Sequence, residues 1–261
     1  MKPLTGAQAH EFASRHGGCA IAVMAKANYP GLVKTRLVPP LSPDAAAALS
    51  ASFLQDMTEN IALAGRSAEI HGYVAYAPAA SEAAFWDMTA TGTRLVLADG
   101  ASISTPGVGG FGRSLLQAAQ TLFAMGHRAV CLLNSDSPTL PTRVLVEAAE
   151  TLAKAGDRMV LGPAEDGGYY LIGIKAPHLH LFRDIAWSTA EVARQTRMRA
   201  AELGLAAVEL DTWYDVDDAP SLLRLCGELA STPAGEPPGY RASATTDCLL
   251  RWRIPQLLIA A

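Results

Sequence analysis

Apolar and polar positions follow two different periods along this chain. Short apolar runs predict β-strands over residues 19–25, 70–76, 94–98, 129–133, 159–161, 169–174 and 206–210, and the first of these is a candidate buried strand. Apolar residues at helical spacing predict helices over residues 81–89, 112–125, 141–155, 189–203 and 219–230. Strands that alternate with helices are typical of βαβ units, so we expect a largely parallel sheet.

The longest predicted helix has signals at both of its ends. Ser42 supplies a capping hydroxyl, and Pro43 suits the first helical position. Gly65 is expected to end the helix. Apolar residues recur between these ends at helical spacing: Ala46, Leu49, Phe53, Met57 and Ile61.

The two ends of the chain differ from this central pattern. Residues 1–17 predict a short helix and a lead-in. Residues 231–245 are rich in Pro, Gly, Ser, Thr and Ala, which is typical of a linker or loose tail. The apolar segment 249–261 is expected to pack on the body or on the second subunit of a homodimer. We therefore expect one domain over residues 1–230, followed by a linker and C-terminal tail over residues 231–261.

Composition narrows the class of protein. Half of the 261 residues are apolar and 18% are charged, which indicates a globular protein with a large core. The net charge of −4 leaves no basic surplus for a nucleic-acid backbone, so nucleic acid is not an expected partner. Any anionic ligand must then be held by local basic residues.

The cysteines and the N-terminus indicate the compartment. Four cysteines lie far apart and are expected to be reduced thiols in the core, at positions Cys19, Cys131, Cys226 and Cys248. The N-terminus has no signal-peptide pattern, and no apolar run is long enough to span a bilayer. A cytoplasmic protein without a membrane partner is therefore expected.

Charged residues gather directly after the predicted strands. The loop after the first strand carries Lys26, Lys34 and Arg36. Three later loops, over residues 134–138, 162–169 and 211–218, are acidic. Because open parallel sheets bind ligands beyond the carboxyl ends of their strands, basic and acidic loops should meet at one edge.

Cations beside carboxylates suit a ligand made of phosphates and a metal ion. Lysine and arginine bind phosphate oxygens, and aspartates such as Asp136, Asp215 and Asp217 bind a hard divalent cation. Alternatives remain open for each group. Lys34 and Arg36 are also compatible with solvated loop charges, and Asp217 or Asp218 with a cap of the helix at 219–230.

Other motifs are weaker. The segment 107–112 matches G-x-G-x-x-G and precedes a predicted helix, but no strand leads directly into it, so a dinucleotide-binding dehydrogenase is not favoured. The Asp166-Gly167-Gly168 segment has the composition of a tight turn, and its glycines also permit a close approach of a ligand. No zinc or α/β-hydrolase pattern is present.

Five blocks of residues occur in an order that resembles one known family. The blocks are Lys26-x-x-x-Pro30-Gly31-x-Val33-Lys34-Thr35-Arg36-Leu37, Ser135-Asp136-Ser137-Pro138-x-Leu140, Gly162 to Gly173, Trp187-Ser188-Thr189 and Trp213-Tyr214-Asp215-Val216-Asp217. They resemble a bacterial family of the nucleotide-diphospho-sugar transferase (GT-A) superfamily. Members are often labelled arsenosugar-biosynthesis glycosyltransferases. This family is similar to 2-phospho-lactate and molybdenum-cofactor guanylyltransferases.

The resemblance implies a three-layer α/β/α fold and a set of residue roles. Lys26, Pro30, Gly31, Lys34, Thr35, Arg36, Gly109 and Gly112 would bind the nucleotide, and Asp136 with Asp217 or Asp215 would hold Mg²⁺ or Mn²⁺. Asp166, Gly167, Gly168, Tyr169 and Tyr170 would face a small-molecule acceptor. Lys34, Arg36, Asp136 and Asp166 would be the catalytic residues. The chain departs from the family at Ala27, where proline is usual, and at residues 110–113, where Asp-Leu-Gly and an arginine are usual.

The resulting functional hypothesis is a metal-dependent transferase. Our first choice is a nucleotidyltransferase that moves a nucleoside monophosphate from a nucleoside triphosphate to an anionic acceptor and releases pyrophosphate. One alternative is a glycosyltransferase with a nucleotide-diphospho-sugar donor. A second alternative, suggested by the altered glycine segment, is a nucleotide-binding protein that has lost catalysis.

Overall fold

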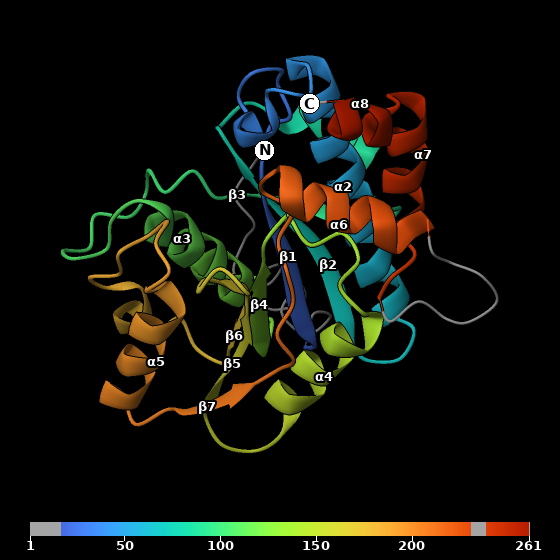
Figure 1. Ribbon diagram of the computed structural model, residues 1–261. Coiled ribbons are helices and arrows are strands. Elements are labelled where there is room, and N and C mark those ends of the chain that lie inside the picture. The colour runs from blue at the N-terminus through green and yellow to red at the C-terminus, as the bar shows by residue number, and fades with distance from the viewer. Residues whose placement is uncertain (1–16, 231–238, 261) are drawn as a thin grey trace.

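The seven strands of this protein form one mixed sheet, as Figure 1 shows. The computed structural model describes residues 17–230 and 239–260. Within them the strand order is β3-β2-β1-β4-β6-β5-β7, and every neighbouring pair is parallel except those made by β6. The strands are β1 (Cys19–Lys26), β2 (Ile70–Ala77), β3 (Arg94–Leu97), β4 (Ala129–Leu133), β5 (Arg158–Pro163), β6 (Tyr169–Ile174) and β7 (Ala206–Glu209).

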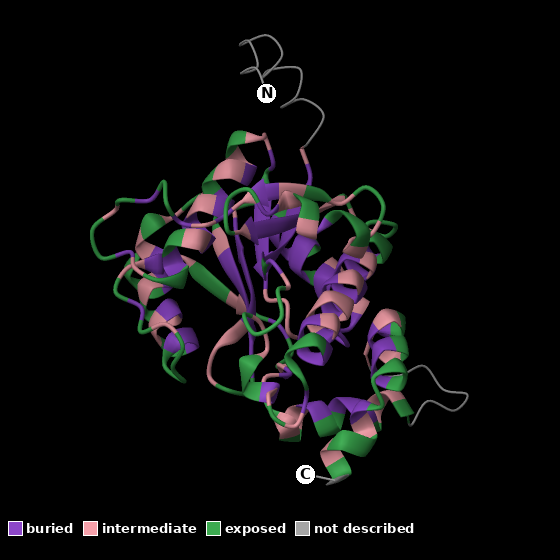
Figure 2. Ribbon diagram, turned by 90° about the horizontal axis from the view of Figure 1, so that it is seen from above, coloured by how far each residue is buried: buried purple, intermediate pink, exposed green. Residues whose placement is uncertain are grey.

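Helices cover both faces of the sheet, which confirms the expected three-layer α/β/α fold. One face packs against α2 (Pro43–Ala64) and α4 (Thr142–Ala153). The other packs against α3 (Phe111–Ala124) and α5 (Val192–Glu202). In β1, odd-numbered residues such as Ile21 enter the first core and even-numbered residues such as Ala22 enter the second. Because both sides are buried, the strand is a continuous apolar run. Figure 2 shows buried strands at the centre of the molecule.

A third core, at the amino-terminal half of α2, positions two loops of the sheet edge. It joins α2 to α6 (Ala219–Ala230), α7 (Ser243–Arg251) and α8 (Ile254–Ala260). Leu37, from the loop after β1, is completely buried there, and so is Val216, from the loop after β7. The third core therefore fixes the basic loop and an acidic loop beside each other.

Polar side chains just before α2 and within it cap two helices, α2 itself and α7. Ser42 accepts a hydrogen bond from the Ala45 amide at 3.1 Å, as the sequence predicts for a helix cap. The buried carboxylate of Asp56 accepts hydrogen bonds from the amides of Ala244 and Thr245 at 3.0 and 2.7 Å. These amides belong to the first turn of α7, so Asp56 caps that helix from a distance in the sequence.

The structure corrects one predicted helix and leaves two segments outside the described residues. Residues 81–89 form two 3₁₀ turns, Glu82–Ala84 and Trp86–Met88, around the buried ring of Phe85. Their backbone hydrogen bonds span three residues rather than four. The predicted helix over residues 1–17 lies almost wholly outside the described part, and so do residues 231–238 of the predicted linker.

Two further findings concern cysteines and membrane spans. All four cysteines are free and buried, as predicted. None of the helices within residues 17–230 and 239–260 combines the length and apolar character needed to cross a membrane.

We predict that Asp56→Ala lowers the free energy of unfolding by about 1–2 kcal/mol at neutral pH, because two amides of α7 lose their acceptor. Burial raises the pKa of Asp56 from 3.8 to about 6. Between these values the folded protein keeps a proton that the unfolded chain releases, so wild-type stability falls relative to the variant as pH rises. The difference between the two proteins should be larger near pH 4.5 than near pH 7.5, as measured by urea unfolding.

The matched control is Asp247→Ala, which removes an exposed carboxylate from α7 itself. It should change stability by less than about 0.5 kcal/mol at either pH. Equal losses for the two variants would show that Asp56 does not cap α7.

Candidate functional site

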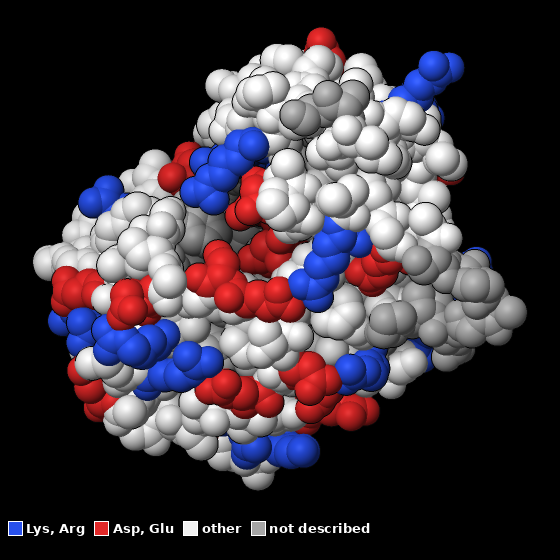
Figure 3. All heavy atoms as spheres, viewed as in Figure 1, with Lys and Arg blue, Asp and Glu red and all other residues white. Residues whose placement is uncertain are grey.

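A cavity of about 490 Å³ lies at the carboxyl ends of β1, β2 and β4. Basic and acidic residues from the predicted loops line it together: Lys26, Lys34, Arg36, Asp136 and Asp217. On the face shown in Figure 3, acidic side chains gather around a hollow with basic side chains at its rim. The expected meeting of cationic and acidic loops at one sheet edge is therefore present.

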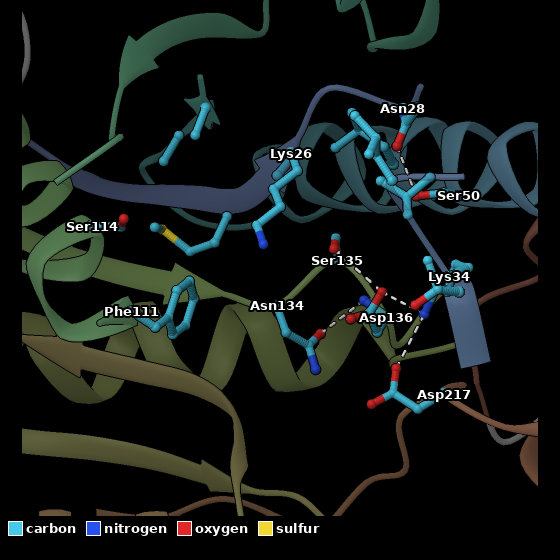
Figure 4. A pocket seen from close by; sticks show the side chains of 18 of the residues that line it. Lys26, Asn28, Lys34, Ser50, Phe111, Ser114, Asn134, Ser135, Asp136 and Asp217 are labelled. Atoms are coloured by element: carbon cyan, nitrogen blue, oxygen red, sulfur yellow. Dashed lines mark hydrogen bonds and ion pairs between the residues drawn. The ribbon is translucent and has the colours of Figure 1, made fainter. Parts of the chain in front are cut away.

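The ammonium of Lys34 is the electrostatic centre of this cavity. It lies 2.6 Å from Asp136 Oδ1 and 3.4 Å from Asp217 Oδ1, and it donates a hydrogen bond of 2.6 Å to the Val216 carbonyl. Only 5% of the Lys34 side chain is exposed. In the close-up of Figure 4 the two carboxylates converge on this ammonium from different loops. Lys34 is thus a buried charge with two charged partners, rather than a solvated loop charge.

The loop after β1 reaches this position through an unusual local backbone. Lys34 has φ +48° and ψ +37°, in the left-handed region, and it precedes the 3₁₀ turn Thr35–Leu37. Buried Leu37 ends that turn in the third core. The Lys34 ammonium also lies 5.2 Å from the centre of the Phe53 ring on α2. Leu37 and Phe53 thus direct the long side chain toward the acidic loops.

The acidic side of the cavity is held by hydrogen bonds between loops. The Asp136 carbonyl, just beyond β4, accepts a hydrogen bond from the Val216 amide at 2.8 Å. Asp215 Oδ1 accepts hydrogen bonds from Asn134 Nδ2 at 2.6 Å and from Ser137 Oγ at 2.7 Å. Burial, and then the nearby Asp136 charge, raise the pKa of Asp215 to about 6, against the Ser137 and Asn134 hydrogen bonds. Asp215 therefore ties the two loops together.

The structure separates the roles that the sequence left open between Asp217 and Asp218. Asp218 Oδ1 accepts hydrogen bonds from the Ser221 amide and hydroxyl at 2.9 and 2.6 Å, so Asp218 caps the start of α6. The Asp217 carboxylate instead faces Lys34 in the cavity. Burial, and then the Asp136 charge, raise the pKa of Asp217, although Lys34 opposes this shift.

Asp136 and Asp217 form a place where a cation fits. Their carboxylates already share the Lys34 ammonium, which stands in for a positive ion there. Within the described part of the chain no group of three or more His, Cys, Asp or Glu side chains is arranged to hold a metal. Two carboxylates are compatible with Mg²⁺, which commonly takes one or two from the protein and the rest of its ligands from phosphates and water.

The other predicted nucleotide-binding residues divide between the cavity and its surroundings. Arg36 is 74% exposed at the rim, 3.9 Å from Asp217. Lys26 ends β1 and points into the cavity, and Thr35 also lines it. Pro30 and Gly31 are exposed and do not line the cavity.

The glycine segment contributes to the cavity through residues that the sequence did not single out. Gly109 and Gly112 do not line it. A Cβ at Gly112 would lie 2.9 Å from the Trp187 indole, so this glycine permits close packing of α3 against the turn that carries Trp187. Phe111, which is 46% exposed, and Ser114 line the cavity instead. The ring of Phe111 meets that of Trp187 edge to face at 5.8 Å.

Asn134 is a second residue that sequence reasoning missed. It follows β4 directly, lines the cavity and holds Asp215. The strand-end rule that selected Asp136 also applies to Asn134, so that signal was present in the sequence.

The predicted acceptor loop needs a partial correction. Asp166 is exposed, and its Oδ1 accepts a hydrogen bond from the Gly168 amide at 2.8 Å, as in a tight turn. Gly167 has φ +90°, and a Cβ there would lie 2.3 Å from the Ala190 carbonyl, so the turn requires glycine. Tyr170 is fully buried and donates a hydrogen bond to the Asp211 carbonyl, and the hydroxyl of half-buried Tyr169 is also buried. Neither phenol can contact an acceptor in this structure, because β6 directs them into the two opposite cores.

Comparisons with known proteins agree with this architecture. A family model described as "Uncharacterized protein conserved in bacteria (DUF2064)" matches residues 60–189. No curated protein matches the sequence at a significant level. A solved structure from Desulfovibrio desulfuricans G20, of a proposed nucleotide-diphospho-sugar transferase, is 26% identical with a TM-score of 0.73. That match covers 92% of this chain and 98% of the other.

One more distant structure shares the fold, and another is similar at a lower score. A cytidylyltransferase from Leptospira borgpetersenii serovar Hardjo-bovis is 10% identical with a TM-score of 0.52, over 93% of this chain and 97% of the other. A CMP:2-keto-3-deoxy-manno-octonic acid synthetase complexed with CTP is 12% identical with a TM-score of 0.49, over 82% and 99%. With the Desulfovibrio match and the sheet topology, the resemblance found in the sequence is confirmed. The chain belongs to the nucleotide-diphospho-sugar transferase (GT-A) superfamily and is a transferase.

Proposed function

We propose that this protein is a metal-dependent nucleotidyltransferase that moves a nucleoside monophosphate from a nucleoside triphosphate to a small anionic acceptor. The observation that carries the proposal is the cavity in which three basic residues of one loop face two convergent carboxylates. The chain as a whole is acidic, so this local concentration of positive charge favours a polyanionic ligand. A triphosphate with its metal ion has the matching charges.

The residues of the cavity take distinct parts in this proposal. Asp136 and Asp217 would hold Mg²⁺ or Mn²⁺, with Asp215 as a supporting residue that fixes their loops. The metal ion would neutralise the phosphates and stabilise the charge that develops on the departing pyrophosphate. Lys26 and Arg36 would bind phosphate oxygens, Arg36 through its planar fork. Thr35 lines the same wall, and Pro30 and Gly31 shape the loop behind it.

The nucleotide would lie along the cavity with its base near α3. In Figure 4, Phe111 lies on one side of Lys26, and Lys34 with its carboxylates lies on the other. The exposed ring of Phe111, supported by Trp187, offers an apolar surface on which a base can stack. Gly112 serves this arrangement by giving Trp187 room, and Gly109 lies in the turn before it.

The reaction would exchange one P–O bond for another. An oxygen of the acceptor would attack the α-phosphorus, a new P–O bond would form, and the bond to the β-phosphate oxygen would break to release pyrophosphate. The turn of Asp166 does not line the cavity, but it packs next to the loop of Asp215 through the hydrogen bond of the Glu165 amide to the Trp213 carbonyl, so we propose that the acceptor approaches from this turn. Every residue with a proposed role lies within residues 1–230, which we propose as the transferase domain.

A glycosyltransferase is the second candidate. The Desulfovibrio structure favours it, because that protein is described as a proposed nucleotide-diphospho-sugar transferase. In a glycosyltransferase the same carboxylates would hold the metal of a nucleotide diphosphate, and Asp166 would act as a base. The altered glycine segment motivates a third candidate, a nucleotide-binding protein without turnover.

A ligand panel tests these candidates. We predict that nucleoside triphosphates with Mg²⁺ raise the melting temperature more than nucleotide sugars do, because a ligand that binds the folded state stabilises it by mass action. Pyrophosphate should then be released when a phosphorylated acceptor is added. Release of a nucleoside diphosphate from a nucleotide sugar would support the glycosyltransferase, and binding without either product would support a binding protein.

We predict that Asp136→Asn lowers Mn²⁺-dependent triphosphate affinity at least about tenfold, because the metal would lose a charged ligand. Calorimetric titration with and without Mn²⁺ measures this effect. The matched control is Asp211→Asn, which removes an exposed carboxylate that pairs with Arg143 outside the cavity. Unchanged metal-dependent binding by the Asp136 variant would remove this residue from the proposed metal site.

Arg36 separates the two leading reactions. A triphosphate needs one more cationic contact than a diphosphate sugar does, and Arg36 is an exposed cation at the rim. We predict that Arg36→Ala weakens triphosphate binding about tenfold to a hundredfold, and diphosphate-sugar binding less. Arg36→Lys should restore only part of the loss, because an ammonium cannot reproduce a bidentate fork.

The control for this experiment is Arg251→Ala, which removes an exposed arginine from α7 outside the cavity and should leave both affinities unchanged. Equal losses for the two ligands in the Arg36 variant would favour the glycosyltransferase. No loss for either would make Arg36 a solvated surface charge.

A further inference from the structure

The ammonium of Lys34 is engaged by protein groups: it donates hydrogen bonds to the Val216 carbonyl and to Asp217 Oδ1, and it forms an ion pair with Asp136. An ammonium has three donors, and Lys34 faces three protein acceptors within 3.4 Å: Asp136 Oδ1, Asp217 Oδ1 and the Val216 carbonyl. With 5% of its side chain exposed, it is also shielded from solvent. In this arrangement the Lys34 charge is directed at protein acceptors, although the residue lines the cavity and lies in the loop expected to bind a phosphate.

The same ammonium lies where the proposed metal ion belongs. Asp136 and Asp217 come from different loops, and two carboxylates at such close range need a cation between them. A divalent ion bound to both would be within a few ångströms of the Lys34 charge, and two cations at that distance repel strongly. Lys34 and a metal ion therefore compete for one position.

The loop that carries Lys34 has few other attachments on its ligand side. Pro30, Gly31 and Leu32 are exposed, Leu32 at 69%. Lys34 itself has left-handed backbone angles, which are uncommon for a lysine. Leu37, fully buried in the third core, marks the point where the loop becomes fixed. The ion pairs of Lys34 thus hold the exposed part of the loop against the acidic side.

We propose that Lys34 is an internal counter-cation that occupies the metal position in the metal-free protein and moves to the phosphates when metal and nucleotide bind. The proposal rests on the proposed function for the identity of the ligand. The proposal predicts positive coupling between metal binding and triphosphate binding. A metal ion that binds alone must displace the Lys34 ammonium, which then has no new partner. A triphosphate supplies that partner. Metal and triphosphate should then strengthen each other's binding by the same factor.

The test is direct Mn²⁺ binding, followed by the paramagnetic resonance signal of free Mn²⁺. Lys34→Met keeps the length of the side chain and removes its charge. In the absence of nucleotide it should bind Mn²⁺ at least about tenfold more tightly than wild type does. A non-hydrolysable triphosphate should tighten Mn²⁺ binding strongly in the wild-type protein and only weakly in the variant.

The matched control is Lys26→Met, which removes the same charge from the same cavity at a residue with no ion pair to either carboxylate among the described contacts. Its gain in Mn²⁺ affinity should be much smaller than that of Lys34→Met. If the two gains are equal, or if Lys34→Met binds Mn²⁺ no better than wild type, Lys34 is a fixed structural charge and the proposal is wrong.

A measurement on the wild-type protein covers the case in which Lys34→Met does not fold. Hydrogen exchange of the peptide over residues 29–37 should change when Mn²⁺ and triphosphate are added together and stay unchanged with triphosphate alone. Unchanged exchange in both conditions would overturn the proposal. Binding of Mn²⁺ without nucleotide involves no transfer reaction, so this test does not depend on transferase activity. If Lys34→Met binds Mn²⁺ more tightly but the wild-type protein has no transferase activity, the proposed function is contradicted and this inference stands.

Discussion

The contact on which the rest of the site depends is the ion-pair cluster of one buried lysine with two aspartates. Lys34 lies near the start of the chain, Asp136 in the middle and Asp217 beyond the last strand, so the cluster joins three segments that are distant in the sequence. A buried charge is stable only when partners compensate it, and here each partner is itself placed by a strand end or a loop hydrogen bond. The arrangement of the sheet is therefore what allows the cluster to exist.

The third core gives this cluster its rigidity. Leu37, from the loop of the lysine, and Val216, from the acidic loop, are both buried in it, and α7 covers it through contacts with α2. The cap that Asp56 provides to α7 belongs to the same region, so helices near the end of the described chain support loops that begin near its start. A transferase site on this fold thus draws on helices well beyond the strands that present its side chains.

Much of this fold follows from local rules. The features that local rules do not predict have a common physical cause, which is tertiary packing. The strands at 129–133 and 169–174 have the predicted bounds because buried strands are short apolar runs, and Asp136 lies in the cavity because it follows one of them. The pairing of Lys34 with aspartates depends on where tertiary packing sends a flexible side chain, which spacing does not encode. Residues 81–89 form 3₁₀ turns because Phe85 is buried in the core. The helical spacing of apolar residues in the sequence does not predict this burial. The burial of Tyr169 and Tyr170 was accessible in principle, because adjacent residues of a strand covered on both faces enter opposite cores.

The central claim is that the cavity between the basic loop and the two carboxylates binds a metal ion together with the phosphates of a nucleotide. The most direct measurement is a crystal structure with Mn²⁺ and a non-hydrolysable nucleoside triphosphate, with manganese located by its anomalous scattering. The account predicts a manganese peak between Asp136 and Asp217, phosphates beside Lys26 and Arg36, and a base against Phe111. A nucleotide bound elsewhere, or manganese at a position away from both carboxylates, would contradict it.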